Sequence, residues 1–253
     1  MAPITFHRFL PSEGEVEAQA LAESLDLSSG APGDRPYTVA NFVVTVDGRA
    51  AFQGRSSALG DDGDRAIFHG LRERVDAVLA GTRTLAAERY GRIIGSAERR
   101  ERRVASGRRA EPLAIVISRS GRIPLEIPLF AEPQTTAVVF SPAASDLTPV
   151  AATVHHEPLD PLGAAPLATA MRTLRTKYGV SSLLCEGGPA LFGSLLREGL
   201  VAELFLTVAP KLAGGESGPA ITSGPPMAEL VALNIRHLLE RDGSLYLRYA
   251  LSG

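Results

Sequence analysis

The stretch Leu183–Leu196, which reads LLCEGGPALFGSLL, decides the fold of this chain. Its apolar start predicts the end of a buried β-strand. Gly187 and Gly188 then allow the backbone to turn sharply, and they let another group approach it closely. Pro189 suits the first turn of a helix, where the N–H that proline lacks is not needed. The stretch therefore predicts a strand, a turn without side chains, and a helix.

A turn of this kind is a candidate binding site. Free N–H groups at a helix start and the helix dipole attract an anion, and ligands of parallel sheets bind at the carboxyl ends of the strands. We therefore expect the segment from Glu186 to Pro189 either to meet the diphosphate of a dinucleotide or to be a glycine turn without a ligand. The sequence contains neither G-x-G-x-x-G nor a Walker-type phosphate loop. A dinucleotide would therefore need a fold other than the usual doubly wound one.

Strands and helices alternate along the rest of the chain. Buried strands are expected at residues 37–46, 75–80, 113–118, 136–140, 182–185 and 203–209. Amphipathic helices are expected at residues 64–74, 166–178 and 189–200. This alternation predicts an α/β fold, in which helices cover both faces of a mostly parallel central sheet.

The two ends of the chain differ from this pattern. Two apolar segments, 233–239 and 244–249, flank a turn signal and predict a C-terminal antiparallel hairpin. Residues 1–35 are expected to form an N-terminal extension, with a short acidic helix around Glu13 to Leu25. Residues 36–253 contain no repeat and no low-complexity linker, so we expect them to form a single domain.

The composition argues against several classes of protein. The chain has 253 residues, a formal net charge of -2 and 45% hydrophobic residues, which is ordinary for a globular protein and not basic enough for a general nucleic-acid binder. Cys185 is the only cysteine, so neither a disulfide framework nor a cysteine-rich zinc site is expected. No apolar run reaches the roughly 18 residues of a membrane span. We expect a cytoplasmic protein that has no metal and binds neither nucleic acid nor membrane.

A second set of polar residues lies in the first predicted strand. Asn41, Thr45 and Asp47 share one face of it, because side chains alternate along a strand. Buried polar groups need partners, so a polar ligand is one explanation of this face. The other explanation is a turn at Asp47 and Gly48 that Thr45 caps.

A third candidate is the junction Gly81-Thr82-Arg83-Thr84, where a strand runs into a helix. Its hydroxyl and backbone donors could meet a phosphate, or Thr82 or Thr84 could simply cap the helix. The segment 91–111 is rich in arginine. It is either a solvated loop or exposed helix, or it brings one arginine to a phosphate group of a ligand.

Four motifs in this order resemble the reductase domain of bacterial riboflavin biosynthesis, whose fold is similar to that of dihydrofolate reductase. They are N-x-x-x-T-x-D-G at 41–48, DR-x-x-F-x-x-LR at 64–72, DAVLAGTRT at 76–84, and EGGPAL…AP at 186–210. The resemblance covers roughly residues 36–250. It implies a three-layer fold and an enzyme that uses NADPH to reduce the ribose of a phosphoribosylamino-pyrimidine. It also implies a homodimer.

The resemblance and the junctions together give a set of expected site residues. The cofactor-binding residues are Gly81, Thr82, Thr84, Glu88, Ser118, Glu186, Gly187, Gly188 and Pro189. Ser118, with Arg119 and Arg122 after it, is expected to contact the 2′-phosphate that distinguishes NADPH from NADH. Asn41, Thr45 and Arg65 are expected on the substrate side. The substrate phosphate would be met by Arg55, by Arg65 or by an arginine of the segment 91–111. Asp47 is the candidate proton relay.

Two other functions remain open at this level. A dihydrofolate reductase-like enzyme for a pterin or folate would use the same cofactor site, and a protein could bind NADP without catalysis. The chain lacks the H-x-E and P-C-x-x-C signature of the zinc deaminase that is often fused to this reductase, so it is expected to reduce but not to deaminate.

Overall fold

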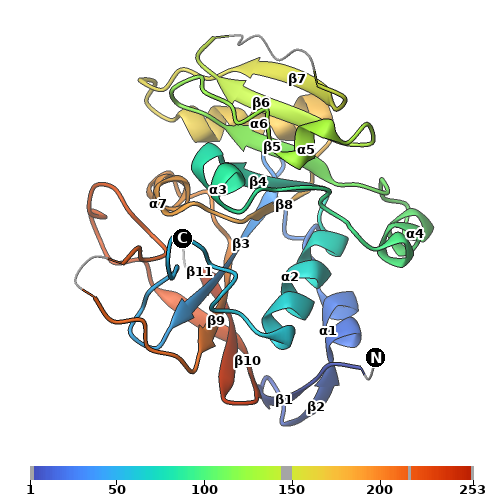
Figure 1. Cartoon of the computed structure of the whole chain (residues 1–253), viewed down its shortest axis with the longest axis vertical. Coiled ribbons are helices and arrows are strands. Elements are labelled where there is room, and N and C mark those ends of the chain that lie inside the picture. Colours follow the sequence, from blue (N-terminus) through green and yellow to red (C-terminus); the bar gives the residue numbers. More distant parts are fainter. Residues whose placement is uncertain (1–2, 144–149, 216–217, 252–253) are drawn as a thin grey trace.

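A computed structural model of the chain describes residues 3–143, 150–215 and 218–251. In these residues the strands form one sheet with the order β2-β1-β10-β11-β9-β3-β8-β4-β5-β6-β7 (Figure 1). Neighbouring strands from β9 through β7 are parallel. The strands β2, β1, β10 and β11 join as antiparallel strands. The predicted α/β fold with a mostly parallel sheet and a C-terminal antiparallel hairpin is confirmed.

The strands are β1 Thr5–Leu10, β2 Gly14–Glu17, β3 Tyr37–Thr45, β4 Ala77–Gly81, β5 Leu113–Ile117, β6 Thr136–Ser141, β7 Thr153–Pro158, β8 Ser182–Cys185, β9 Glu203–Ala209, β10 Leu233–Arg241 and β11 Ser244–Leu251. The helices are α1 Ala18–Ser24, α2 Asp62–Arg74, α3 Thr82–Ala87, α4 Ala97–Ala105, α5 Pro128–Ala131, α6 Pro166–Tyr178 and α7 Pro189–Arg197.

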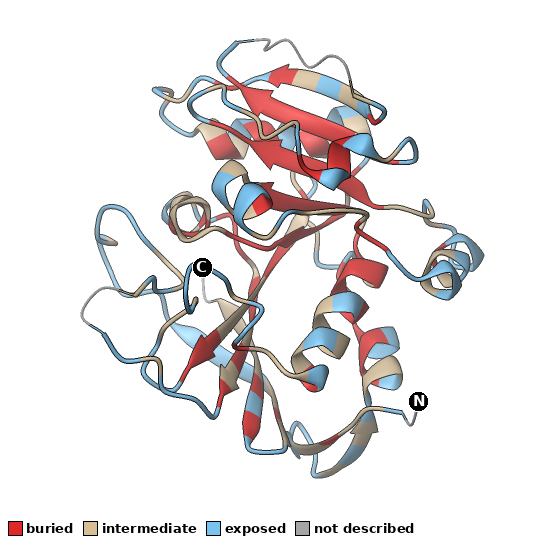
Figure 2. Cartoon of the chain, viewed as in Figure 1, coloured by how far each residue is buried: buried red, intermediate tan, exposed pale blue. Residues whose placement is uncertain are grey.

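Alternating side chains of the central strands build a hydrophobic core on each face of the sheet. On β4, Ala77 and Leu79 belong to the core formed with α6 and α7, whereas Val78 and Ala80 belong to the core formed with α2, α3 and α5. Figure 2 shows the central strands buried and the outer sides of the helices exposed. The sheet with helices on both faces is therefore the predicted three-layer arrangement.

The N-terminal segment contributes two strands that were not predicted. β1 pairs with β10, and β2 pairs with β1 at the edge of the sheet. The helix expected from Glu13 to Leu25 is shorter than predicted, because Glu15 and Val16 lie in β2 and the helix starts at Ala18. Val16 packs against the small core that contains Phe6, which explains why this stretch is extended.

Two short elements, β7 and α5, were also missed, whereas the helix expected after the junction Gly81-Thr82-Arg83-Thr84 is present as α3. β7 is an edge strand whose residues are mostly exposed or half-buried, so it lacks the continuous apolar run of a buried strand. His155 and His156 lie within β7.

The arginine-rich segment contains a helix, α4, that packs against α2. Arg99 and Arg102 both pair with Glu73, at 2.6 Å and 2.7 Å. Arg103 is 1% exposed, and its guanidinium donates hydrogen bonds to the carbonyl oxygens of Arg72, Glu73 and Val75 at the end of α2. These three arginines therefore fix α4 against the end of α2.

Candidate active site

A cavity of about 540 Å³ lies where β3, β4 and β8 end. Residues from β3, from the loop 50–60, from α2, from α3 and from the segment 186–189 line it. These three strands are parallel neighbours, so their carboxyl ends meet at one edge of the sheet. This is the edge at which α/β proteins bind ligands, and the volume is in the range of small-molecule sites.

Gly188, the second glycine of the pair, forms part of the wall of this cavity, and Gly187 lies just behind it in the chain. Gly81 donates its N–H to the carbonyl oxygen of Gly187 at 2.8 Å, which fixes the turn to the end of β4. Gly187 has φ +91°, and the peptide bond to Gly188 is cis. A Cβ at Gly188 would lie 2.8 Å from Oγ1 of Thr84, and one at Gly187 would lie 3.1 Å from the ring of Phe42. Only glycines fit this approach of the turn to its neighbours.

A buried cluster of charged and polar groups stands beside this turn. Arg72 donates from Nε to Oε1 of Glu186 at 2.7 Å and from Nη2 to Oε2 at 2.8 Å. The hydroxyl of Tyr90 donates to Oε2 of Glu186 at 2.6 Å, and the guanidinium lies 4.1 Å from the ring centre of Phe68.

The cluster shifts the pKa values of its members. Burial acts to lower the pKa of Arg72, but the Glu186 carboxylate and its hydrogen bonds outweigh burial and raise that pKa. Burial and the Glu186 charge raise the pKa of Tyr90 well above its ordinary value. Arg72 is therefore charged and Tyr90 neutral over the physiological pH range.

Most of the predicted site residues line the cavity. They are Asn41, Arg65, Thr84, Glu88, Glu186, Gly188 and Pro189. Glu88 accepts hydrogen bonds from the backbone N–H and the hydroxyl of Ser56, each at 2.9 Å. Glu88 thereby ties the loop 50–60 to the end of α3.

Other predicted residues lie around the cavity without lining it. Gly81 and Thr82 form the junction of β4 and α3. The carbonyl oxygen of Gly187 accepts a hydrogen bond from the N–H of Gly81. Ser118 is buried at the end of β5, and its hydroxyl donates to the carbonyl oxygen of Arg122 at 2.9 Å. Ser118 thus shapes the turn on which the exposed side chain of Arg122 stands.

Thr45 and Asp47 bond to each other. The hydroxyl of Thr45 donates to Oδ1 of Asp47 at 2.5 Å, and Asp47 also accepts the N–H groups of Ala213 and Gly214 at 3.1 Å and 2.8 Å. These hydrogen bonds, the one from Thr45 first, lower the pKa of Asp47 to about 2. Asp47 is therefore ionised at neutral pH and orders the loop after β9. Neither residue lines the cavity described above.

Sequence reasoning missed Arg72 and Tyr90 as parts of the site, and from the loop 50–60 it named Arg55, which does not line the cavity. Arg72 had a signal, because it ends the DR-x-x-F-x-x-LR motif and follows the fully buried Leu71. Glu186 supplied a second signal for Arg72, since a buried carboxylate needs a cation as its partner. Tyr90 and the loop carry no comparable pattern, because only the fold brings them to the cavity.

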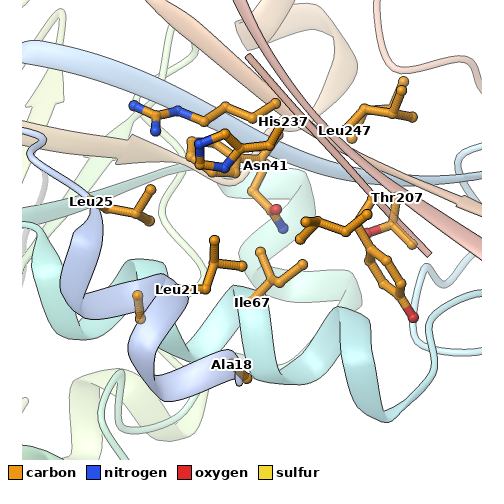
Figure 3. Close-up of a pocket in the computed structure, with 14 residues that line it drawn as sticks. Ala18, Leu21, Leu25, Asn41, Ile67, Thr207, His237 and Leu247 are labelled. Carbon is orange, nitrogen blue, oxygen red and sulfur yellow. The ribbon is translucent and has the colours of Figure 1, made fainter. Parts of the chain in front are cut away.

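A second cavity, of about 20 Å³, lies between the helices α1 and α2 and the sheet (Figure 3). Leu21, Leu25 and Ile67 form its helix side, and Asn41 extends from β3 toward Ile67. Asn41 lines both cavities. This volume is far below that of a cofactor site, so the larger cavity is the candidate active site.

In the three described ranges of the chain, no three or more His, Cys, Asp and Glu side chains are grouped so that they could hold a metal ion. Within those ranges no helix has the length and apolar character needed to cross a membrane.

Comparison with known proteins identifies the family. The chain belongs to the RibD C-terminal domain family, whose model matches residues 36–245. Among its relatives is the 2,5-diamino-6-ribosylamino-4(3H)-pyrimidinone 5′-phosphate reductase of Archaeoglobus fulgidus, which is 29% identical over 198 residues, or 75% of this chain and 87% of the archaeal protein. The protein with the same description from Methanothermobacter thermautotrophicus is 24% identical over 87% of this chain and 100% of its own length.

The fold is also found in a solved structure. A pyrimidine reductase-like protein from Corynebacterium diphtheriae matches with a TM-score of 0.77 and 23% identity, over 94% of this chain and 100% of that chain. These relationships identify the chain as a reductase of a riboflavin biosynthesis family, and the family resemblance inferred from the sequence is confirmed.

Proposed function

We propose that this chain is an NADPH-dependent reductase, which converts the ribose of a phosphoribosylamino-pyrimidine into an open ribityl chain in riboflavin biosynthesis. The observation that carries the proposal is the cavity at the carboxyl edge of the sheet, with Gly188 of the glycine turn and Thr84 side by side in its wall. The family and the names of the archaeal relatives support the same reaction class.

The residues present fit a nicotinamide dinucleotide. No side chain caps the start of α7 at Gly188, so backbone donors of its first turn are left for a diphosphate. Gly188 lets the hydroxyl of Thr84 come close to the backbone of the turn, so backbone and hydroxyl donors stand together in one wall of the cavity. We assign the cofactor to Gly81, Thr82, Thr84, Glu88 and the segment 186–189.

We infer that the coenzyme is NADPH and not NADH. Arg119 and Arg122 are exposed in the turn after β5, and the buried hydroxyl of Ser118 holds that turn through the carbonyl of Arg122. β5 is the parallel neighbour of β4, so this turn lies at the same edge of the sheet as the cavity. Guanidinium groups at this edge suit a ribose 2′-phosphate.

The substrate phosphate requires a cation, and the cavity offers several. Arg65, Arg83 and Arg89 line it in addition to the paired Arg72. We propose Arg65 as the phosphate partner, because its ion pair with Asp62, at 2.5 Å, is solvent-exposed and so costs little to give up. Asn41 would bind the pyrimidine side of the substrate.

Bound NADPH supplies a hydride for the carbon of the opened ribose. The protein's main contribution to catalysis is to hold the two reactants together and to exclude water. The Arg72–Glu186–Tyr90 cluster makes one wall rigid, and Glu88 holds the loop 50–60 through Ser56. The relay role of Asp47 stays a prediction. Asp47 is ionised at neutral pH, so it has no proton to give until it first accepts one.

We further propose that residues 36–253 form the reductase domain of a cytoplasmic homodimer, with residues 1–35 as an extension. Leu233, Ile235 and Leu245 on β10 and β11 are each 38% to 43% exposed, which supports a contact with a second copy. Cys185 is buried and unpaired, as suits a reducing compartment. Light scattering of the purified chain tests the dimer. A measured mass equal to that of one chain, 26.7 kDa, would contradict it.

The proposed reaction is tested by following NADPH absorbance. The purified protein is mixed with NADPH and the amino-ribosylamino-pyrimidinone phosphate, with dihydrofolate in parallel and NADH as the control coenzyme. Oxidation of NADPH with the pyrimidine alone is the expected result. Oxidation with dihydrofolate would favour a folate reductase, and binding of NADPH without oxidation by either compound would leave a non-catalytic binding protein.

A further inference from the structure

The N-terminal extension packs behind the substrate side of the cavity. Its strand β1 pairs with β10 at the antiparallel end of the sheet, and its helix α1 packs against α2 (Figure 1). The helix α2 in turn carries Arg65, the proposed partner of the substrate phosphate. The match to the family model begins at residue 36, so the extension lies outside it. Its contacts with α2 are therefore a property of this chain beyond the family match.

Two stripes of residues lie on opposite sides of α2. The first lines the cavity, and its members are Arg65, Phe68 and Arg72. The second packs against the extension, and its members are Gly63, Ile67 and Gly70. Both stripes repeat every three or four residues, as a helix of about 3.6 residues per turn requires. A displacement at the second stripe therefore moves the residues of the first.

The two helices come closest where Gly70 meets Ala22 of α1. A Cβ at Gly70 would lie 2.9 Å from the Cβ of Ala22. Carbon atoms in contact lie about 3.5–4.0 Å apart, so a side chain at position 70 would push the helices apart. Ala22 is 6% exposed and belongs to the buried face of α1. The helix α1 therefore sets how far α2 lies from the cavity.

The first turn of α2 has a second support in β1. Phe6 is fully buried, and a Cβ at Gly63 would lie 2.9 Å from Cε1 of its ring. The ring also packs edge-on against Tyr246, with 4.9 Å between the ring centres. The hydroxyl of Tyr246 donates to Asp61, whose side chain caps α2 by accepting the N–H of Asp64, each at 2.8 Å. The extension thus supports the start of α2 as well as its second half.

The helix α1 also closes the small cavity behind Asn41. Leu21 and Leu25 of α1 form part of its helix side, and the side chain of Asn41 extends into it from β3 (Figure 3). Asn41 lines the large cavity too, where we place the pyrimidine. Both residues proposed for the substrate, Asn41 and Arg65, therefore have the extension behind them.

Other contacts hold the cofactor side of the cavity. The residues assigned to the dinucleotide come from the junction of β4 and α3 and from the segment 186–189. The end of α2 that is nearest to them is fixed by Arg72, which is bonded to Glu186, and by Arg103, which is bonded to the carbonyl oxygen of Arg72. A shift of α2 where it meets the extension should therefore disturb the substrate side more than the cofactor side.

We propose that the N-terminal extension is a positioning element of the active site, which sets the place of α2 through Ala22 and Phe6 and thereby the affinity for the pyrimidine substrate. This inference rests on the proposed function. Among the described residues of the extension none lines the large cavity, so the extension acts through α2. A displacement of about 1 Å can cost a catalytic site about 100-fold in rate. The difference between 2.9 Å and an ordinary carbon contact of about 3.5–4.0 Å is close to this size.

The test places a methyl group between the two helices. Gly70→Ala is expected to raise the KM for the phosphoribosylamino-pyrimidine about 10-fold, because α2 and Arg65 are displaced. The Kd for NADPH, measured by fluorescence titration, should change by less than about twofold, because its site is held by other contacts. Alanine is a better helix former than glycine, so α2 itself is not weakened. Binding of NADPH also shows that the variant is folded.

A second change separates positioning from a loss of stability. Ala22→Gly removes the methyl group that Gly70→Ala meets, so the double variant is expected to recover a KM within about threefold of wild type. Glycine in a helix lowers stability, so a defect of stability alone would become worse in the double variant. The matched control within the extension is Gly33→Ala, since a Cβ there meets no atom within 4 Å. Its kinetics should equal those of wild type.

Phe6→Leu tests the contact at the start of α2 independently. It removes the ring edge beside Gly63, so the KM for the pyrimidine should rise by about threefold or more while the Kd for NADPH stays unchanged. Because this variant adds no atoms between the helices, it tests the proposal even if Gly70→Ala does not fold.

Four results would overturn the inference. An unchanged KM in both Gly70→Ala and Phe6→Leu would show that the extension does not position the substrate side. An equal rise in the KM for the pyrimidine and in the Kd for NADPH would show a general disturbance of the fold. A double variant no better than Gly70→Ala would show that the contact with Ala22 is not the cause. A wild type that binds NADPH but reduces no phosphoribosylamino-pyrimidine would overturn the proposed function itself, and this inference with it.

Discussion

Arg72 and Glu186, 114 residues apart in the sequence, form a two-point ion pair that joins α2 to the end of β8. Their side chains are 9% and 2% exposed. The pair lies between the hydrophobic core and the cavity, and Tyr90 bonds to the same carboxylate. Glu186, the residue before the glycine turn, is thus held in place by a helix that is distant from it in the sequence.

The first prediction concerns this pair. Glu186→Gln leaves the Arg72 guanidinium buried without its counter-charge, so the free energy of unfolding should fall by about 3–5 kcal/mol. Urea denaturation measures the change. The matched control is Asp62→Asn, which breaks the exposed pair with Arg65 and should cost less than about 1 kcal/mol. Equal losses in the two variants would contradict the role given to the buried pair.

The second prediction concerns Arg103. Arg103→Met removes three hydrogen bonds to carbonyl oxygens at the end of α2 and leaves those oxygens buried. A loss of about 2–4 kcal/mol in unfolding free energy is expected, together with faster amide exchange near the end of α2. Arg109→Met is the control, because this exposed side chain makes no comparable contact among the described residues. An Arg103→Met protein as stable as the control would refute the capping role.

The third prediction concerns the acid side of the stability curve. Burial, with the charges of Arg248 and Arg8, lowers the pKa of His237 from 6.5 to about 4. Between these values the unfolded chain binds a proton that the folded chain does not, so stability falls as the pH drops from 6.5 toward 4. Denaturation at pH 7.5 and pH 4.5 should show a smaller loss for His237→Gln than for wild type. The same loss in both proteins would contradict this assignment.

The fourth prediction concerns the choice of coenzyme. Replacing Arg119 and Arg122 together by alanine should raise the KM for NADPH about 10-fold or more, since charge-assisted contacts to the 2′-phosphate are lost. The KM for NADH should stay unchanged. Steady-state kinetics with both coenzymes measures the ratio. A parallel rise for both coenzymes would show that the turn after Ser118 does not read the 2′-phosphate.

The central fold could be predicted from the sequence because its signals are local. The buried strands β3, β4 and β8 are apolar runs, and the glycine pair marks the turn between strand and helix. The strands β1, β2 and β7 escaped prediction because they lie at or near the sheet edges, where one face is exposed and the apolar run is broken. Their place depends on pairing with strands distant in the sequence.

The part of the site that lies in local sequence motifs could also be predicted. Thr84 and Glu186 belong to motifs with a recognisable order, and both line the cavity. Asp47 belongs to such a motif too, but its hydrogen bonds go to Ala213 and Gly214, which no local pattern shows.

The most direct test of the central claim follows the transferred hydrogen. NADPH that carries deuterium at the reactive C4 position of its nicotinamide is incubated with the protein and the phosphoribosylamino-pyrimidine, and the product is analysed by mass spectrometry and NMR. The account predicts a ribityl product with one deuterium on the carbon bound to the pyrimidine nitrogen. A product without deuterium, or no ribityl product while NADPH stays bound, would contradict it.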